Sequence, residues 1–376
     1  STITLDGELR DANFDLVAGQ GQATYSAFWP SGLPIKSAHI QGSFDGDTGS
    51  LEIDKLLVDL DGPKLSGRTT VLKLGDGLAI DGVVTIDRLK LEALSRYWPG
   101  NVASRPRKWV LENMPSGIVE GTKATLSLRI PDLATGDIRV ESFAGKLRLR
   151  DTTIYHVKGL PPIRKMAATA VFSRDRFIGT VRSGVAKKLK VRSASVRLTN
   201  LDKDTEQADI DVTVEGALED ALSMIDRPPL GFVSLLGMQP TGVSGRTTTD
   251  LTFSFPIDRS IELADVDIRG RARLTDINVP NFAFGRTISA DSLTLKVDKA
   301  GLELSGEANV GLVPATIKWI ERFDEKEPYK RRYEAQAVLD KDGRKAAGLP
   351  DLSPYLTGPV SVDLSYLQAV KGKKEL

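Results

Sequence analysis

The chain has 376 residues, 40% of them hydrophobic, and a formal net charge of +1. This composition can supply a large core, and the near-neutral charge argues against a dedicated nucleic-acid binder, whose affinity depends on neutralising phosphates. The absence of cysteine excludes disulfides and thiol catalysis, and two isolated histidines, His39 and His156, do not suggest a metal cluster, so we expect no cofactor.

Residues 1–86 resemble a meander of strands. Leu51 and Ile53 alternate with Glu52 and Asp54, which is the period of a strand with one buried face. Asp-Gly pairs predict the hairpin turns, and they are Asp6-Gly7, Asp45-Gly46, Asp61-Gly62, Asp76-Gly77 and Asp81-Gly82. FDGDTGSLEID also resembles the start of a calcium loop, but its twelfth position is Leu56 rather than Glu, so a turn is the better interpretation.

Residues 87–114 predict a helical hairpin. Leu91, Leu94 and Trp98 have helical spacing until Pro99-Gly100, and Ser104 can cap a second helix that ends at Pro115. A second helical region is predicted at 217–238. Its apolar residues and those of the first region are expected to cover part of the sheet as core, or to lie over it as a gate or brace: Leu94, Trp98, Trp109, Val110, Leu222, Ile225, Phe232 and Leu235.

The chain repeats itself. With a constant offset of 125, residues 115–155 match 240–280 at 9 of 41 positions, including Leu126/Leu251, Gly145/Gly270 and Asp151/Asp276, and the apolar alternation stays in register. A unit of roughly 125 residues, present about two and a half times, is indicated. The expected parts are a β-groove segment at 1–86, repeat units at 87–211 and 212–313, and a C-terminal mixed segment at 314–376.

The turns of the predicted strands are too short for the crossovers that parallel strands need, so the fold class is mainly β with an antiparallel sheet. Only two helical regions are predicted to cover this sheet. A large sheet with one apolar face must therefore curl, pair with another sheet or hold something apolar.

One stretch resembles a known family. The run YWPGNVASRPRKWVLENMPSGIVEGTKATLSLRI at 97–130 is similar to a signature of the AsmA-like envelope proteins of Gram-negative bacteria, of the YhdP kind. In that signature an aromatic-Trp-Pro turn and a basic helix lead into a strand. The GLPPI loop at 159–163 is similar to a loop that this family carries, and the resemblance is strongest over 80–215.

The resemblance implies a bridge-like lipid transfer protein of the periplasm. Such a protein has a long, curved antiparallel sheet that forms an open hydrophobic groove, taco-like in section, with short helical hairpins. Its partners would be phospholipid, an envelope protein, and the inner and outer membranes, reached through an anchor outside this chain. One alternative is a structural scaffold or assembly platform for outer-membrane components. Another is an envelope enzyme, for which the sequence offers no catalytic constellation.

Twelve apolar residues that alternate with polar neighbours are predicted to share the lipid-binding face: Leu126, Leu128, Ile130, Leu147, Leu149, Val212, Val214, Leu251, Phe253, Phe255, Leu293 and Leu295. Residues 141–200 carry 14 Lys and Arg against 3 Asp and Glu. The simpler interpretation is a basic outer face. The sharper one places Lys187, Lys188, Lys190 and Arg192 at a rim where anionic headgroups or an acidic partner pass.

Overall fold

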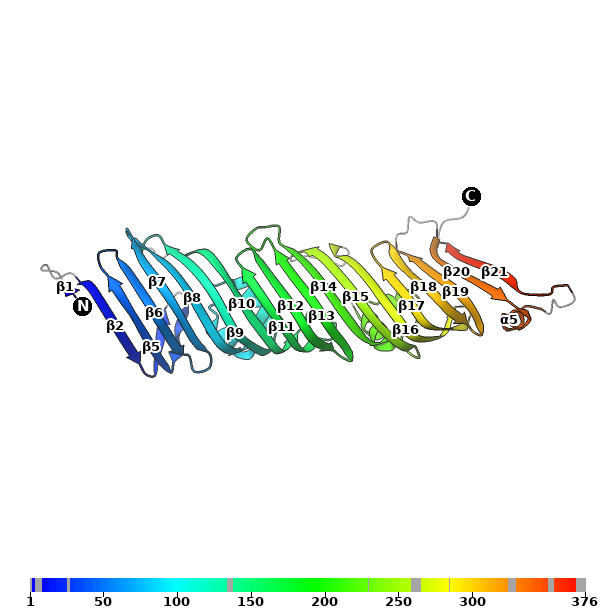
Figure 1. Cartoon of the computed structure of the whole chain (residues 1–376), viewed down its shortest axis with the longest axis horizontal. Helices are drawn as coiled ribbons and strands as arrows, with labels where there is room; N and C mark the ends of the chain where they lie inside the picture. The colour runs from blue at the N-terminus through cyan, green and yellow to red at the C-terminus, as the bar shows by residue number, and fades with distance from the viewer. Residues whose placement is uncertain are drawn as a thin grey trace. The chain divides into compact units, whose positions relative to one another are not determined.

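The computed structural model describes residues 2–3, 9–25, 28–133, 138–228, 230–257, 265–283, 285–323, 329–350 and 355–369. The chain forms two compact units, here called unit 1 and unit 2. Unit 1 comprises Ser1–His156, Ile163–Arg182 and Arg197–Glu206, and unit 2 comprises Val157–Pro162, Ser183–Val196 and Gln207–Leu376. Both units consist mainly of antiparallel strands (Figure 1), which confirms the predicted fold class.

Unit 1 is an antiparallel ladder in sequence order, interrupted once. β1 pairs with β2, β2 pairs with β5, and each strand from β5 to β10 pairs with the next one. The strands are β1 (Thr2–Ile3), β2 (Leu9–Ala18), β5 (Ser37–Asp45), β6 (Ser50–Asp59), β7 (Lys64–Leu74), β8 (Gly77–Lys90), β9 (Ser116–Ile130), β10 (Arg139–Ile154) and β11 (Ile163–Ser173).

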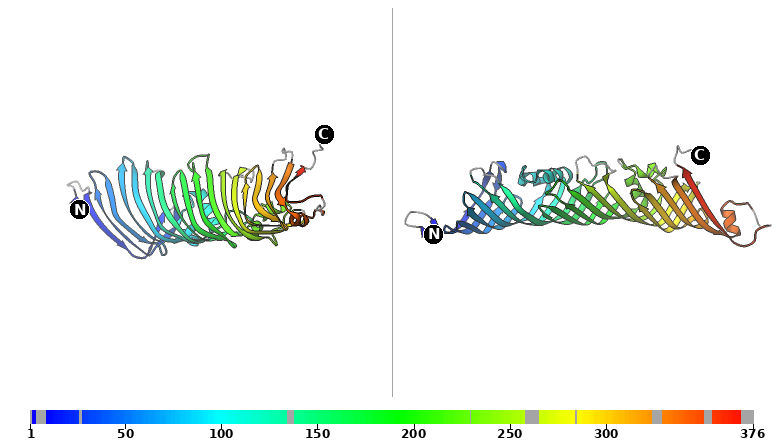
Figure 2. Two further views of the ribbon diagram at one scale, coloured as in Figure 1. Left: turned by 45° about the vertical axis from the view of Figure 1, so that its right-hand side comes forward. Right: turned by 90° about the horizontal axis from the view of Figure 1, so that it is seen from above.

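Two insertions leave this ladder and lie on one side of it. The first is a separate two-stranded hairpin, β3 (Gly21–Tyr25) and β4 (Trp29–Ile35). The second, between β8 and β9, holds the 3₁₀ turn η1 (Leu91–Ala93) and the helices α1 (Leu94–Tyr97) and α2 (Ser104–Asn113). The right-hand view of Figure 2 shows the hairpin and the helices on the same side of the unit 1 sheet.

Unit 2 continues the same pattern. From β14 to β21 each strand pairs antiparallel with the next one. The strands are β14 (Gln207–Ala217), β15 (Ser244–Pro256), β16 (Asp267–Ala283), β17 (Arg286–Val297), β18 (Gly301–Val310), β19 (Val313–Arg322), β20 (Tyr329–Leu339) and β21 (Val360–Ala369). The helices are α3 (Leu218–Ile225), α4 (Phe232–Leu235) and α5 (Lys341–Ala346). Two further strands, β12 (Arg176–Ala186) and β13 (Leu189–Thr199), contribute residues to both units.

The register separates apolar from polar side chains in both ladders, because residues directly opposite each other in antiparallel strands project to the same side. In unit 1 one unbroken apolar row crosses β5 to β10: Phe44, Leu51, Val71, Ile80, Leu128 and Val140. The neighbouring row on the opposite side is polar: Ser43, Glu52, Thr70, Asp81 and Ser127. In unit 2 an apolar row crosses β16 to β21: Ala272, Leu295, Leu304, Trp319, Tyr333 and Tyr366. We call these two sides the apolar face and the polar face of each unit.

Most of the predicted turns within the described residues are correct. The turn after β5 is stabilised by the Asp45 carboxylate, whose Oδ1 accepts from the backbone N–H groups of Asp47 at 2.9 Å and Thr48 at 3.1 Å. Hydrogen bonds from Thr48 lower the pKa of this carboxyl. The turn predicted at Asp81-Gly82 is wrong, because both residues lie inside β8 and pair with β7 and β9. Asp6-Gly7 lies outside the described residues.

The two helical regions are found where the sequence predicts them, but two details differ. Ser104 does not cap α2. The cap is Ala103 in the left-handed region, with φ of 45°, and no side chain closes the first turn. Several residues expected to cover the sheet face outward instead. Trp109 is 48% exposed, Ile225 39%, Phe232 36% and Leu235 71%, whereas Leu94 and Val233 are buried.

The internal repeat extends to the backbone conformation. Asp151 in β10 and Asp276 in β16 are equivalent in the repeat, and both adopt the left-handed region, with φ of 50° and 54°. Both lie where the pairing register with a neighbouring strand shifts. Such a bulge is uncommon for a non-glycine residue, so its recurrence supports a common origin of the two strand pairs.

The buried role of α1 can be tested by truncation. Leu94 forms a core cluster with Leu89, Leu91 and Met114. Leu94→Ala should therefore lower the free energy of unfolding by about 2–5 kcal/mol, while Trp109→Ala on the exposed side of α2 should lower it by less than about 1 kcal/mol. Urea unfolding followed by circular dichroism measures both. Equal losses would show that α1 does not pack on the sheet.

Candidate functional site

The structure places the predicted residues of unit 1 on its apolar face. Leu128 lies in the row that runs from Phe44 to Val140, and Leu126 is directly opposite Phe143 of β10. Leu147 is opposite Ala170 and Leu149 is opposite Ala168, so the face continues onto β11. The residues at 126, 128, 130, 147 and 149 are all half-buried. They therefore form one apolar surface that the chain shields only in part.

The predicted residues of unit 2 share its apolar face in the same way. Val212 is opposite Leu251, and Phe255 is opposite Ala208. Phe253 is opposite Ile210 on one side and Ile268 on the other. Of the remaining three, Val214 is opposite Thr249 of β15, and Leu293 and Leu295 pair with Leu274 and Ala272 of β16.

Protein covers only part of each face. In unit 1, η1, α1 and α2 bury Leu89, Leu91, Leu94 and Met114. In unit 2, Leu218 of α3 belongs to a cluster that includes Trp319 and Leu293, which is 2% exposed, so Leu293 lies in a sealed core. Nine of the twelve predicted residues belong to neither cluster nor its packed surroundings: Leu126, Leu128, Ile130, Leu147, Val212, Val214, Leu251, Phe253 and Phe255.

The N-terminal part of this face is not among the site residues predicted from the sequence. Phe44, Leu51, Val71 and Ile80 continue the row of Leu128 across β5 to β8, and all four are half-buried. These strands show the same alternation of apolar and polar residues from which the site residues of the later strands were predicted. Only the register shows that these strands join the same row.

An ion pair interrupts the apolar face of unit 2. Glu321 of β19 is 1% exposed, and its carboxylate accepts from Arg331 of β20 at 2.6 and 3.1 Å. The indole of Trp319 donates to the same carboxylate at 3.2 Å. Arg331 also donates to the backbone oxygen of Leu236, just after α4, at 2.9 Å. The pair therefore attaches the α3–α4 segment to the sheet.

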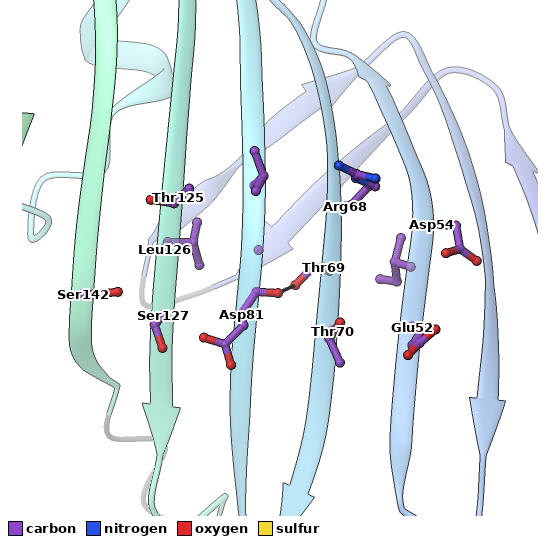
Figure 3. Close-up of a pocket in the computed structure, with 13 residues that line it drawn as sticks. Glu52, Asp54, Arg68, Thr69, Thr70, Asp81, Thr125, Leu126, Ser127 and Ser142 are labelled. Carbon is purple, nitrogen blue, oxygen red and sulfur yellow. Dashed lines mark hydrogen bonds between the residues drawn. The ribbon is translucent and has the colours of Figure 1, made fainter. Parts of the chain in front are cut away.

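The polar face of unit 1 carries a shallow depression of about 520 Å³. Glu52, Asp54 and Asp81 line it together with Arg68 and several hydroxyl side chains. Figure 3 shows them spread over neighbouring strands, with Thr69 donating to the backbone oxygen of Asp81 at 3.0 Å. The acidic side chains are exposed, and the arrangement is that of a solvated strand face.

The basic residues predicted to contact headgroups lie in unit 2, at the turn between β12 and β13 and along β13. Leu189 faces inward, since a Cβ added at Gly216 would lie 2.5 Å from its side chain. The basic neighbours face the other way: Lys188 is 3.8 Å from Asp220 of α3, and Arg192 is 3.4 Å from Glu215. Two of the four cations thus already have acidic partners.

The remaining polar groups do not assemble into a reactive centre in the part of the chain that the structure describes. His39 lies on the polar face of β5, 2.8 Å from the Asp15 carboxylate. His156 follows β10 in an exposed loop. Across the described ranges, no three His, Asp or Glu side chains are grouped to hold a metal ion. No helix in those ranges has the length and apolarity needed to cross a bilayer.

Comparison with known proteins identifies a family. The family model described as YhdP protein matches residues 2–366, nearly the whole chain. No curated protein and no solved structure matches the chain significantly.

The contribution of the Glu321–Arg331 ion pair to the stability of unit 2 can be tested by substitution. Arg331→Met leaves the Glu321 carboxylate buried without its partner, which should destabilise unit 2 by about 3–5 kcal/mol. The double variant Glu321→Leu with Arg331→Met removes both charges and should recover most of that loss. Urea unfolding of the three proteins measures the difference. A double variant as unstable as Arg331→Met would contradict this account of the pair.

Proposed function

The chain belongs to the YhdP family, and we propose from this membership and from its apolar faces that it shields phospholipid acyl chains as they pass between the inner and outer membranes. The proposed location is the periplasm, as part of a protein anchored in the inner membrane. Acyl chains would lie along the apolar face while the headgroups stay in water. Shielding of this kind requires positioning rather than covalent chemistry, so we propose a non-enzymatic role.

One observation supports the proposal above the others: both units have an apolar face that the described residues leave partly uncovered. Soluble monomers rarely expose contiguous apolar patches larger than a few hundred Å². In unit 1 the half-buried row continues across β5 to β9. In unit 2 the half-buried apolar residues lie on β14, β15 and the start of β16, where Phe253 is opposite Ile210 and Ile268. An apolar ligand that covers these rows would remove them from water.

The energetics of such a face suit transport better than storage. Each CH₂ group removed from water contributes about 0.8 kcal/mol, so a diacyl lipid would be held firmly. The rows repeat similar aliphatic residues from strand to strand, so a chain that moves sideways exchanges one such contact for another. Lateral movement would then cost little compared with release into water.

The rim residues Lys187, Lys188, Lys190 and Arg192 fit a secondary role in this proposal. The turn that carries Lys187 and Lys188 lies beside the start of α3, where Lys188 approaches Asp220. A headgroup passing this edge would meet positive charge. The alternative, a scaffold or assembly platform for outer-membrane components, uses the same sheet without lipid, and the experiment below separates the two.

Charge substitutions on the apolar face test the proposal. Leu128→Asp and Phe253→Asp place a carboxylate on half-buried positions that belong to no core cluster. Because water can reach these positions when no lipid is present, both variants should fold with a nearly unchanged melting temperature. Native mass spectrometry should detect phospholipid on the unmodified chain purified from a Gram-negative host, and both variants should lose it.

Two controls make this test specific. Ser127→Asp adds the same charge on the polar face of the same strand and should retain lipid. Leu293→Asp places the charge in the sealed core of unit 2 and should unfold it, because burying an unpaired charge costs several kcal/mol. Absence of lipid on the unmodified chain would favour the scaffold. Unfolding of Leu128→Asp and Phe253→Asp would show that their positions are core.

A further inference from the structure

A second depression on the polar face of unit 1 differs in charge from the rest of that face. It measures about 510 Å³ and is lined by residues of β9 to β12. Its charged side chains are all cationic, namely Lys146, Arg148 and Arg182, and the hydroxyls of Thr169 and Thr180 lie among them. The first depression, by contrast, is lined by three carboxylates and one arginine. The two hollows therefore favour ligands of opposite charge.

These three cations have no acidic partner within the described residues. Their neighbours do: Arg88 and Arg150 both contact Glu120, at 3.1 and 2.9 Å, and Arg129 contacts Glu141 at 3.1 Å. The nearby carboxylates of Glu120 and Glu141 thus already form ion pairs with other arginines. Glu120 is also directly opposite Arg148, so this one carboxylate lies beside three arginines, and the depression keeps a net positive potential.

The pairing of β9 with β10 adds to the concentration of charge. Lys146 is directly opposite Lys123, so two lysine side chains leave the sheet on the same side. Directly opposed like charges destabilise a sheet. An anion bound between them would relieve this repulsion.

Gly121 leaves room for the Arg148 side chain. Gly121 has φ of +55° and lines the depression, and a Cβ added to it would lie 3.0 Å from Nη2 of Arg148. The guanidinium therefore lies across the backbone of β9 where a larger residue would displace it. A planar guanidinium presents paired N–H donors, which match the oxygens of a phosphate group.

We propose that Lys146, Arg148 and Arg182, with the hydroxyls of Thr169 and Thr180, form a binding site for a phosphate or phosphoester group. The site lies on the polar face, opposite Leu147 and Leu149 of the same strand, so it is separate from the face that would shield acyl chains. The phosphoester could belong to an anionic headgroup at a bilayer surface or to a soluble phosphate compound. Both sources share the chemistry that the site recognises.

The test compares two triple variants of the whole chain. Lys146→Gln, Arg148→Gln and Arg182→Gln together remove the site. Arg88→Gln, Arg129→Gln and Arg176→Gln together remove the same charge from cations that have acidic partners. Circular dichroism and melting curves check that both fold. Inorganic pyrophosphate, titrated by calorimetry at about 0.1 M salt to screen long-range attraction, should bind the site variant at least about tenfold more weakly than the unmodified chain. It should bind the control almost normally.

Two further arms distinguish the source of the phosphate and the kind of anion. Cosedimentation with phosphatidylglycerol vesicles, but not with phosphatidylcholine vesicles, that is lost only in the site variant would identify a headgroup. Pyrophosphate binding without vesicle binding would identify a soluble ligand. Pyrophosphate should also raise the melting temperature of the unmodified chain and not that of the site variant.

Three results would overturn the proposal. The first is an equal loss of binding in both triple variants, which would mean that the overall charge and not the site attracts the anion. The second is binding of polyglutamate as tight as that of pyrophosphate, which would mean that the site accepts any acidic chain. The third is no pyrophosphate or vesicle binding by the unmodified chain.

Discussion

The alternation of side chains along antiparallel strands is the constraint on which the rest of this structure depends. Directly opposed residues share a side, so an apolar residue at every second position produces rows that cross each ladder without interruption. Phe44, Leu51, Val71, Ile80 and Leu128 form such a row in unit 1. A sheet built in this way has one face that water does not favour, and something must cover it.

In each unit, one helical segment of the chain covers part of the apolar face and leaves the rest of that face partly exposed. In unit 1 the segment between β8 and β9 packs on one end of the face, around Leu89 and Leu94. In unit 2 the α3–α4 segment packs through Leu218 and is attached at its far end by Arg331. Both devices are local, and each seals only the rows beneath it. The predicted apolar residues outside these covered parts stay half-buried in each unit.

The strands, their faces and both helical regions could be predicted from the sequence, because period-two alternation and helical spacing are local properties. It failed where the outcome depends on contacts across strands. Asp81-Gly82 has the composition of a turn, yet pairing on both sides keeps it inside β8. Leu235 has the spacing of a core residue but is 71% exposed, since Val233 takes the buried position of α4. The Glu321–Arg331 pair and the unpaired Lys146 and Arg148 were also hidden, because charge partners are set by register rather than by order along the chain.

Register also keeps the two proposed binding surfaces apart on a single strand. In β10, Leu147 belongs to the apolar face and its neighbours Lys146 and Arg148 to the polar face, so a slip by one residue would exchange them. Gly145 opposes such a slip. A Cβ there would lie 2.5 Å from the ring of Phe172, which packs against Phe143 with ring centroids 5.1 Å apart.

The repeat uses the same device in unit 2. Gly270 is the equivalent of Gly145, and a Cβ there would lie 2.6 Å from Val297 and 3.0 Å from Leu251. In both strands a larger side chain from a neighbouring strand lies close to the glycine, in space that a Cβ would occupy. The alternation of apolar and polar residues therefore sets the two faces, and these glycines add a steric constraint on how the strands align.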